Sequence, residues 1–185
     1  MLVSTVHADV NHYMPLQLID PQDKLKDLSF DGSLFGASWK PLLVELVDES
    51  PYLCGDFATL ETVLGVLVCN EKAITCLLPC LNEEIEILPL TVVNHSESYF
   101  IINILNVVDC LNEARSRIIR SVFSGRIIAI EEYDFFDAKI NNALLFKVPQ
   151  VVRKTVFSTS AFKGIVQDNR LSGLEFRPVT RGRVE

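Results

Sequence analysis

Residues 66–90, with the sequence VLVCNEKAITCLLPCLNEEIEILPL, decide the fold that we expect. The stretch opens on an apolar β-type run, Val66–Cys69. Asn70 then stands where a helix N-cap is favoured, and Glu71 is favourable in the first turn. Four residues follow at helical spacing: Ala73, Cys76, Leu77 and Cys80. This spacing predicts a helix that buries one face.

The same stretch also predicts where the helix stops and what comes next. Pro79 is incompatible with a continuing helix, so we expect the helix to end or kink near residue 78. Residues 85–88 alternate apolar and polar side chains, which predicts a strand that stops at Pro89. Residues 66–90 are therefore expected to form a β-α-β unit.

A second stretch, residues 155–179 (TVFSTSAFKGIVQDNRLSGLEFRPV), repeats this pattern 89 positions later without a gap. The capping Asn70 falls on Thr159, the compared apolar positions stay apolar, and one Glu and one Pro are identical. Gly173 comes just after the second helix, where a C-cap or turn favours glycine. We interpret the two stretches as related β-α-β units. The alternative is a chance similarity between two ordinary segments.

The rest of the chain adds strands rather than helices. Short apolar runs predict further strands at Leu16–Ile19, Leu42–Val47, Tyr99–Asp109, Ile127–Ile130 and Ala143–Val148. Residues 109–116 are expected to form a turn or a short helix. Because strands outnumber helices, we predict an α+β fold: a mixed or antiparallel sheet with a few short helices.

The two units also divide the chain. Residues 1–98 form an acidic N-terminal half with the first unit, and residues 99–185 form a C-terminal half with the second. We expect one compact domain or two closely packed lobes.

The composition is that of a globular protein of 185 residues, with 49% hydrophobic and 22% charged residues. The apolar fraction excludes intrinsic disorder, and five cysteines, an odd number, argue against a disulfide scaffold. No signal-peptide pattern is visible, and the apolar runs are shorter than the roughly 20 residues of a spanning helix. We therefore expect a cytoplasmic protein without a membrane partner.

The net charge of −7 is unevenly distributed. Residues 1–98 contain 4 basic and 15 acidic residues, a net charge of −11. Residues 99–185 contain 13 and 9, a net charge of +4. An acidic surface attracts basic partners and repels nucleic acid. The alternative is that the two surfaces complement each other within the molecule.

No pattern predicts a catalytic, cofactor or metal site. Cys69, Cys76 and Cys80 lack the close pairing of zinc ligands, so we interpret them as structural. The sequence contains no G-x-S-x-G elbow and no glycine-rich phosphate loop. Arginine clusters at residues 115–120 and 177–183 make only a weak case for nucleic acid, because the acidic chain opposes phosphate binding.

One segment is typical of a protein-binding surface. Residues 131–137, EEYDFFD, interleave four acidic with three aromatic side chains. Aromatic anchors surrounded by charge are characteristic of binding hot spots. The candidate contact residues are Glu131, Glu132, Tyr133, Asp134, Phe135 and Phe136. The alternative is that the aromatic rings face the core and the acidic groups are its solvated side.

Residues 99–118, YFIINILNVVDCLNEARSRI, resemble the central signature of a polymorphic-toxin immunity protein family, the Myxococcus-type immunity domain, formerly a domain of unknown function. Residues 145–149, LFKVP, and residues 156–179 are similar to the C-terminal ending of that family. Residues 55–90 are similar to the N-terminal half of the family, including the E-x-L-P-L motif with which that half ends. The resemblance covers roughly residues 40–180, and residues 158–160 depart from it where the family has a more acidic turn.

The resemblance implies a bacterial immunity protein that binds a cognate secreted toxin in the cytoplasm and neutralises it by occluding or locking its active site. The signature residues look like core and turn positions, so none is transferred as a site residue. A basic toxin would suit the acidic half. Second-choice contact residues are Asp48, Glu49, Glu83 and Glu84.

Two other classes of function stay open. One is an enzyme that acts on a small molecule. Two converging carboxyl groups, one of them with a raised pKa, would favour this class. The other is a self-associating structural module, and a homodimer is also compatible with an immunity protein. We assign no cofactor, no metal and no nucleic-acid partner.

Overall fold

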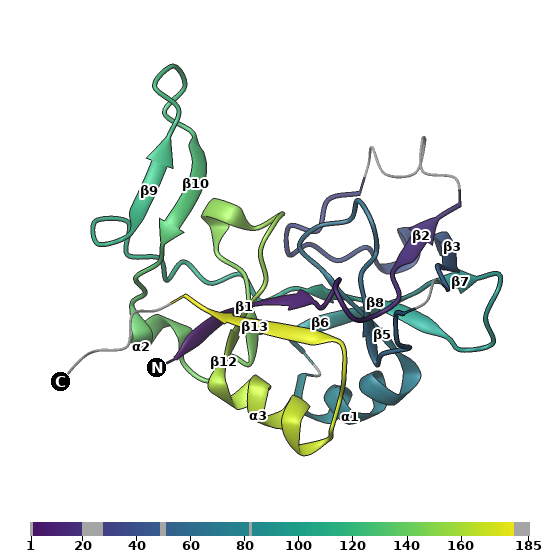
Figure 1. Cartoon of the computed structure of the whole chain (residues 1–185). Helices are drawn as coiled ribbons and strands as arrows, with labels where there is room; N and C mark the ends of the chain where they lie inside the picture. Colours follow the sequence, from purple (N-terminus) through teal and green to yellow (C-terminus); the bar gives the residue numbers. More distant parts are fainter. Residues whose placement is uncertain (1, 20–27, 49–50, 82, 180–185) are drawn as a thin grey trace.

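A computed structural model describes residues 2–19, 28–48, 51–81 and 83–179 (Figure 1). The strands are β1 Val3–Ala8, β2 Leu16–Leu18, β3 Leu43–Leu46, β4 Phe57–Ala58, β5 Leu67–Asn70, β6 Ile85–Pro89, β7 Thr91–Val92, β8 Tyr99–Ile104, β9 Arg117–Arg120, β10 Ile127–Glu132, β11 Leu145–Phe146, β12 Phe157–Thr159 and β13 Leu174–Pro178. The helices are α1 Glu71–Leu81, α2 Asp137–Ile140 and α3 Ser160–Asp168, with 3-10 turns η1 Gly36–Ser38 and η2 Pro149–Val151. The predicted α+β class is confirmed, although the chain is mostly sheet.

Each β-α-β unit builds its own four-stranded sheet. The strand orders are β4-β5-β8-β6 and β11-β12-β1-β13. In each sheet the two strands of the unit are antiparallel to a strand between them, so they run parallel to each other. A shift of 89 residues places β6 on β13 and the start of α1 on the start of α3. The predicted strand–helix–strand form of both units is confirmed, and their relation to each other stays a prediction.

The register is also the same in the two sheets. Glu86 of β6 lies opposite Asn103 of β8, and its counterpart Glu175 of β13 lies opposite His7 of β1. The central strands come from different places in the chain, because β8 follows its unit whereas β1 precedes the other. The sequence did not lead us to predict β1, which pairs with residues more than 150 positions away.

The first helix begins as predicted and ends later. The Asn70 side-chain oxygen accepts a hydrogen bond from the Ala73 amide at 3.0 Å, which caps α1. The helix includes Pro79 and continues to Leu81, so the expected end near residue 78 is wrong. Its buried face contains Ala73, Leu77 and Leu81, while Cys80 is exposed. The prediction for Cys80 is wrong because Leu81, one turn after Leu77, takes the inward position.

Other predicted elements differ in detail. Thr159 stands at the N-cap of α3, but its hydroxyl donates to the Ala143 carbonyl instead of accepting from the helix. The strand expected over residues 99–109 ends at Ile104, and the strand expected over 143–148 keeps only β11. Residues 109–116 form turns, in which the Asn112 carbonyl accepts from the Arg115 and Ser116 amides.

One apolar cluster joins the two units. α1 and α3 lie side by side on the same side of the molecule (Figure 1). Leu77 of α1 and Phe162 of α3 are buried in a common core with residues of β1, β5 and β8. β8 of the C-terminal half pairs with β5 and β6, and β1 of the N-terminal half pairs with β12 and β13. The halves therefore share strands, and the boundary at residue 98 stays a prediction.

Candidate functional site

The β9–β10 hairpin projects from the body of the molecule (Figure 1). Within the part of the chain that the structure describes, β9 and β10 pair only with each other. The register shifts twice along β10, and such irregularities bend and twist a strand. We call residues 117–132 the arm. The sequence analysis predicted β10 but missed β9, although Ser124-Gly125 between two Ile-rich runs is a hairpin signal.

A hydrogen-bonded turn shapes the tip of the arm. The Ser121 amide donates to the Arg126 carbonyl at 2.8 Å, and the Gly125 amide donates to the Ser121 carbonyl at 2.9 Å. The Ser121 hydroxyl oxygen accepts from the Phe123 and Ser124 amides. The turn leaves Val122 92% exposed and Phe123 99% exposed. Exposed apolar side chains on a projecting, ordered turn are available to a partner.

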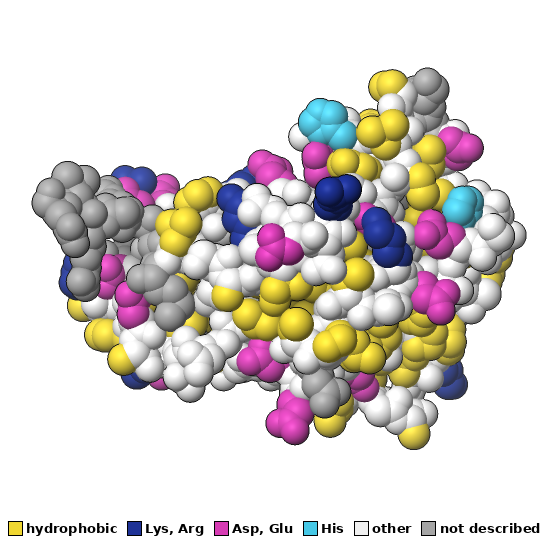
Figure 2. Space-filling view, turned by 90° about the horizontal axis from the view of Figure 1, so that it is seen from below, with side chains coloured by type: hydrophobic (Ala, Val, Ile, Leu, Met, Phe, Trp, Pro, Cys, Tyr) yellow, Lys and Arg dark blue, Asp and Glu magenta, His cyan; other side chains and the backbone are white. Residues whose placement is uncertain are grey.

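Arginines of the arm and its base balance the acidic residues selected from the sequence. The ion pairs, as N–O distances, are Arg117–Glu131 at 2.9 Å, Arg117–Glu132 at 3.6 Å and Arg115–Asp134 at 3.5 Å. Arg120 pairs in the same way with Glu113. These groups are partly solvated, so each pair contributes little stability. Because the charges are paired, the base of the arm has no patch of purely acidic or purely basic groups. Basic and acidic groups are also interspersed on the face of the molecule that Figure 2 shows.

The three aromatic residues of the segment 131–137 are in different environments. Phe135 is 8% exposed and packs in a core cluster, with its ring centroid 5.5 Å from that of Phe157. Tyr133 is half-buried against the same cluster, and burial raises the pKa of its hydroxyl. Phe136 is 46% exposed, with the Lys139 ammonium 5.3 Å from its ring centroid. Only Phe136 therefore presents a large part of its ring to solvent.

Comparison with known families bears on this part of the chain. Residues 90–181 match the immunity protein family Imm11. We call residues 90–181 the Imm11 segment, after the family whose model they match. The match confirms the resemblance to a toxin immunity family, and immunity families generally contain no enzymes. No curated protein matches the chain.

The Imm11 match includes the arm and the second β-α-β unit. It starts at residue 90, immediately before β7, and ends beyond β13. The first β-α-β unit, residues 66–90, lies almost entirely before it. The similarity of residues 55–90 to the N-terminal half of the family stays a prediction.

The described second-choice acidic residues do not belong to the arm. Asp48 is exposed just after β3, a strand that lies on the other side of the body from the arm in Figure 1, and Glu49 lies outside the described residues. Glu83 is exposed in the turn before β6. Glu84 is half-buried: burial raises the pKa of its carboxyl group, although the Leu144 and Leu145 amides donate to it. Glu84 therefore joins the two halves rather than extending the surface of the arm.

A polar cluster that joins residues before the Imm11 segment to residues within it was not visible in the sequence. The buried Asp56 carboxylate accepts from the Ser172 amide at 2.9 Å and from the Lys72 ammonium at 3.0 Å. The Asn70 amide nitrogen donates to Asp56 at 3.3 Å and to Glu97 at 2.8 Å. Burial alone would raise the pKa of Asp56, but these hydrogen bonds hold it below its ordinary value. The cluster thus holds an ionised carboxylate in place, which differs from the raised pKa that an acid catalyst needs.

A buried amine connects the N-terminal segment to the Imm11 segment. Lys147 is fully buried, and its ammonium group donates to the Phe30 carbonyl at 2.6 Å. Burial lowers the pKa of Lys147 to about 8. Because no solvent reaches the amine, we interpret it as a structural contact.

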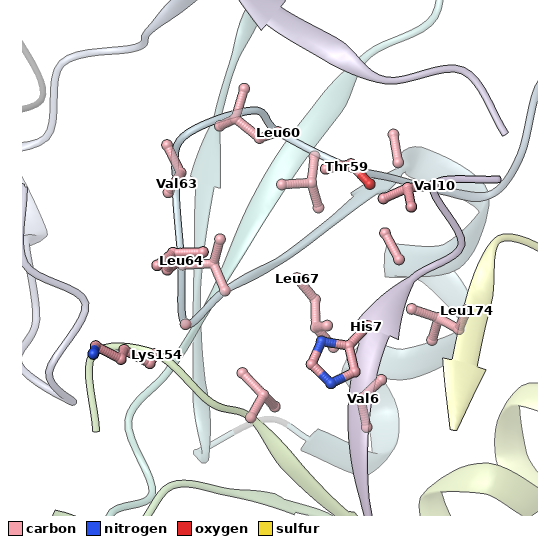
Figure 3. A pocket seen from close by; sticks show the side chains of 16 residues that line it. Val6, His7, Val10, Thr59, Leu60, Val63, Leu64, Leu67, Lys154 and Leu174 are labelled. Atoms are coloured by element: carbon pink, nitrogen blue, oxygen red, sulfur yellow. The ribbon is translucent and has the colours of Figure 1, made fainter. Parts of the chain in front are cut away.

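The molecule also has an apolar pocket of about 160 Å³ beside β1 (Figure 3). Its walls are mostly Val and Leu side chains from β1, the segment before β5 and the segment before β12. The ionisable residues that line it are His7 and Lys154. Burial lowers the pKa of His7, and the nearby Arg177 lowers it further. The lining contains no carboxyl group that could pair with these bases.

The described residues form neither a candidate metal cluster nor a membrane-spanning helix. Among the described residues, no three His, Cys, Asp or Glu side chains are placed to share a metal ion. Cys69 is buried in β5, Cys76 is half-buried and Cys80 is exposed. In the same residues, no helix has the length and apolar character that crossing a membrane requires.

Proposed function

We propose that this chain is an immunity protein that binds one cognate secreted bacterial toxin in the cytoplasm and neutralises it by occluding or locking the toxin's active site. The observation that carries the proposal is that the Imm11 segment contains the arm, which holds exposed apolar side chains away from the body. Soluble proteins seldom expose large apolar groups together unless the surface serves an interaction. The proposal assigns toxin binding to the arm and its base.

The base of the arm supplies the polar rim of this proposed surface. Glu131, Glu132 and Asp134 are held by arginines, and Phe136 lies beside them with about half of its ring exposed. Binding surfaces commonly combine a few apolar anchors with a polar rim that excludes water. Phe135 and Tyr133 pack beneath this surface and support it from the core.

The acidic N-terminal half supports a basic toxin as partner. Because the acidic groups of the arm are already paired, long-range attraction must come from residues 1–98, with a net charge of −11. Such attraction raises the association rate and weakens as salt is added. We therefore expect salt to slow association with the toxin more than it speeds dissociation.

The experiment that tests the proposal uses secreted toxin domains from the organism that this chain comes from, each paired with this chain in turn. Co-expression with one of these domains in a bacterial host should restore growth that the toxin alone abolishes, and the two purified proteins should form a stoichiometric complex. An acidic protein of similar size and charge, co-expressed at the same level, is the control and should not rescue growth. Growth arrest with every toxin domain despite abundant soluble wild-type protein, with no complex on titration, would contradict the proposal.

A further inference from the structure

We propose that Val122 and Phe123 are the anchor of the interface and that they enter an apolar pocket on the toxin, whose rim carries carboxylate groups. This inference rests on the proposed function and specifies the chemistry of the partner. It places the centre of the interface at the tip of the arm, outside the segment 131–137 that the sequence singled out.

The geometry of the tip favours insertion. Phe123 is 99% exposed and Val122 92% exposed, so binding can bury nearly the whole of both side chains. Four hydrogen bonds between Ser121 and residues 123–126 hold the turn, and the Arg120 guanidinium donates to the Gly125 carbonyl at 3.2 Å. Because the turn is already ordered, little conformational entropy is lost when it binds.

The charges near the tip define the rim of the pocket. Arg117 and Arg120 are engaged by Glu131, Glu132 and Glu113. Arg126 is exposed next to the apolar tip, and no ion pair of its guanidinium occurs among the described residues. A carboxylate beside the pocket would give Arg126 a charge-assisted partner. The tip therefore fits an apolar cavity with acidic groups at its edge.

The same charges argue against a second copy of this chain as the partner. The concavities that a neighbouring copy would offer include the apolar pocket beside β1 (Figure 3) and a second pocket lined by Phe30 and Arg153 among others. The ionisable residues of the first pocket are His7 and Lys154 and that of the second is Arg153, so the basic tip would meet a basic side chain in either pocket. Like charges at an interface disfavour the contact, so the occupied pocket belongs to a different protein.

Titration calorimetry with the purified toxin domain that this chain neutralises on co-expression tests the inference. The variants are Phe123→Ala, Val122→Ala and Arg126→Glu, and the control is Leu34→Ala, which removes a side chain that is 68% exposed on another part of the molecule. Phe123→Ala should weaken binding by about 30-fold or more, as expected for a hot-spot residue. Arg126→Glu should weaken it by about tenfold at low salt and by less at high salt, because salt screens the rim contact. Leu34→Ala should stay within about twofold of wild type.

The outcomes separate the inference from the proposed function. If wild type binds the toxin and Phe123→Ala binds within about threefold of it, the anchor is wrong and the immunity function stands. If wild type does not bind the toxin, the proposed function fails and the inference with it. If sedimentation shows a dimer that Phe123→Ala dissociates, the tip serves a second copy and the inference is overturned. Since Phe123 is almost fully exposed, its variant should keep the wild-type melting temperature.

Discussion

Replacing Gly173 by Ala tests how the two β-α-β units are joined. Gly173 has φ +94°, and a Cβ atom at this position would lie 2.3 Å from the Phe57 carbonyl oxygen. That oxygen belongs to the backbone of β4, which is hydrogen-bonded on both sides: β4 pairs with β5, and the Phe57 amide donates to the Ser172 carbonyl at 3.0 Å. No flexible side chain can move aside, so β4 or the 172–174 turn must shift.

Two costs add in the Gly173→Ala variant. A non-glycine residue at positive φ costs roughly 1–2 kcal/mol. Forcing an extra methyl group into a packed site costs roughly 1–3 kcal/mol. Their sum, roughly 2–5 kcal/mol, is a large part of the about 5–15 kcal/mol that stabilises a typical domain. For a chain of this size the melting temperature should fall by roughly 4–20 °C.

Urea unfolding of three glycine variants separates these two costs. At Gly125, φ is +66° and nothing lies within 4 Å of the added Cβ, so Gly125→Ala should show only the conformational cost. Gly164 lies inside α3, also with open space, and Gly164→Ala should stabilise the protein by about 0.5–1 kcal/mol. If Gly173→Ala costs no more than Gly125→Ala, the close contact between the units does not constrain the fold and the reasoning is refuted.

Three further substitutions test the charged groups and the aromatic segment. The pKa of Lys147 in the folded protein, about 8, lies below the ordinary lysine value of 10.5. Wild type should therefore gain up to about 3 kcal/mol of stability between pH 8 and pH 10.5, because only the unfolded chain keeps Lys147 protonated in this range. Urea titrations at pH 7.5 and pH 10.5 should show no such gain in stability for Lys147→Met. If the free energy of unfolding changes with pH in the same way in wild type and variant, the amine is not buried. Asp56→Ala should cost about 2–4 kcal/mol at pH 7, since it leaves the Ser172 amide without its partner. Because the pKa of Asp56 is lowered, the difference in stability between wild type and Asp56→Ala should shrink as pH falls below about 4. If chemical denaturation shows the same difference at every pH, Asp56 is not the ionised, hydrogen-bonded carboxylate described above. Tyr133→Ala should lose about 2–3 kcal/mol of stability and Phe136→Ala less than about 1 kcal/mol, because only the Tyr133 ring packs in a core cluster. Equal melting temperatures for the two variants would refute this distinction.

The sequence allowed prediction of the two β-α-β units because their signals are local. The cap at Asn70 and the helical spacing after it lie within one turn of each other, and the 89-residue shift preserves the apolar pattern. The expected end of α1 was wrong because Pro79 disturbs the backbone of the last turn only locally, while Leu81, 0% exposed, is held in the core at the end of the helix.

The missed features depend on contacts between distant residues. β1 contains Ser4 and Thr5, which are buried only because β12 and β13 cover them on both sides. Asp56 meets Ser172 across 116 residues of sequence, and no spacing rule relates such positions. The segment 131–137 was found by composition, but composition does not show that Phe135 faces the core and that Phe123, in an ordinary Ser-Gly turn, is the most exposed ring.

The placement of β1 has a consequence for how the chain folds as it is synthesised. β1 leaves the ribosome long before the other strands of its sheet, because Ser4 lies opposite Pro178 and the Val179 amide donates to the Val3 carbonyl. The β4-β5-β8-β6 sheet, in contrast, is available once residue 104 has emerged. The nascent chain therefore acquires one unit early and must keep β1 unpaired until β12 has emerged. A ribosome-bound chain halted before β13 would expose β1 as an open edge, and the emergence of β13 would be the step that closes the second sheet.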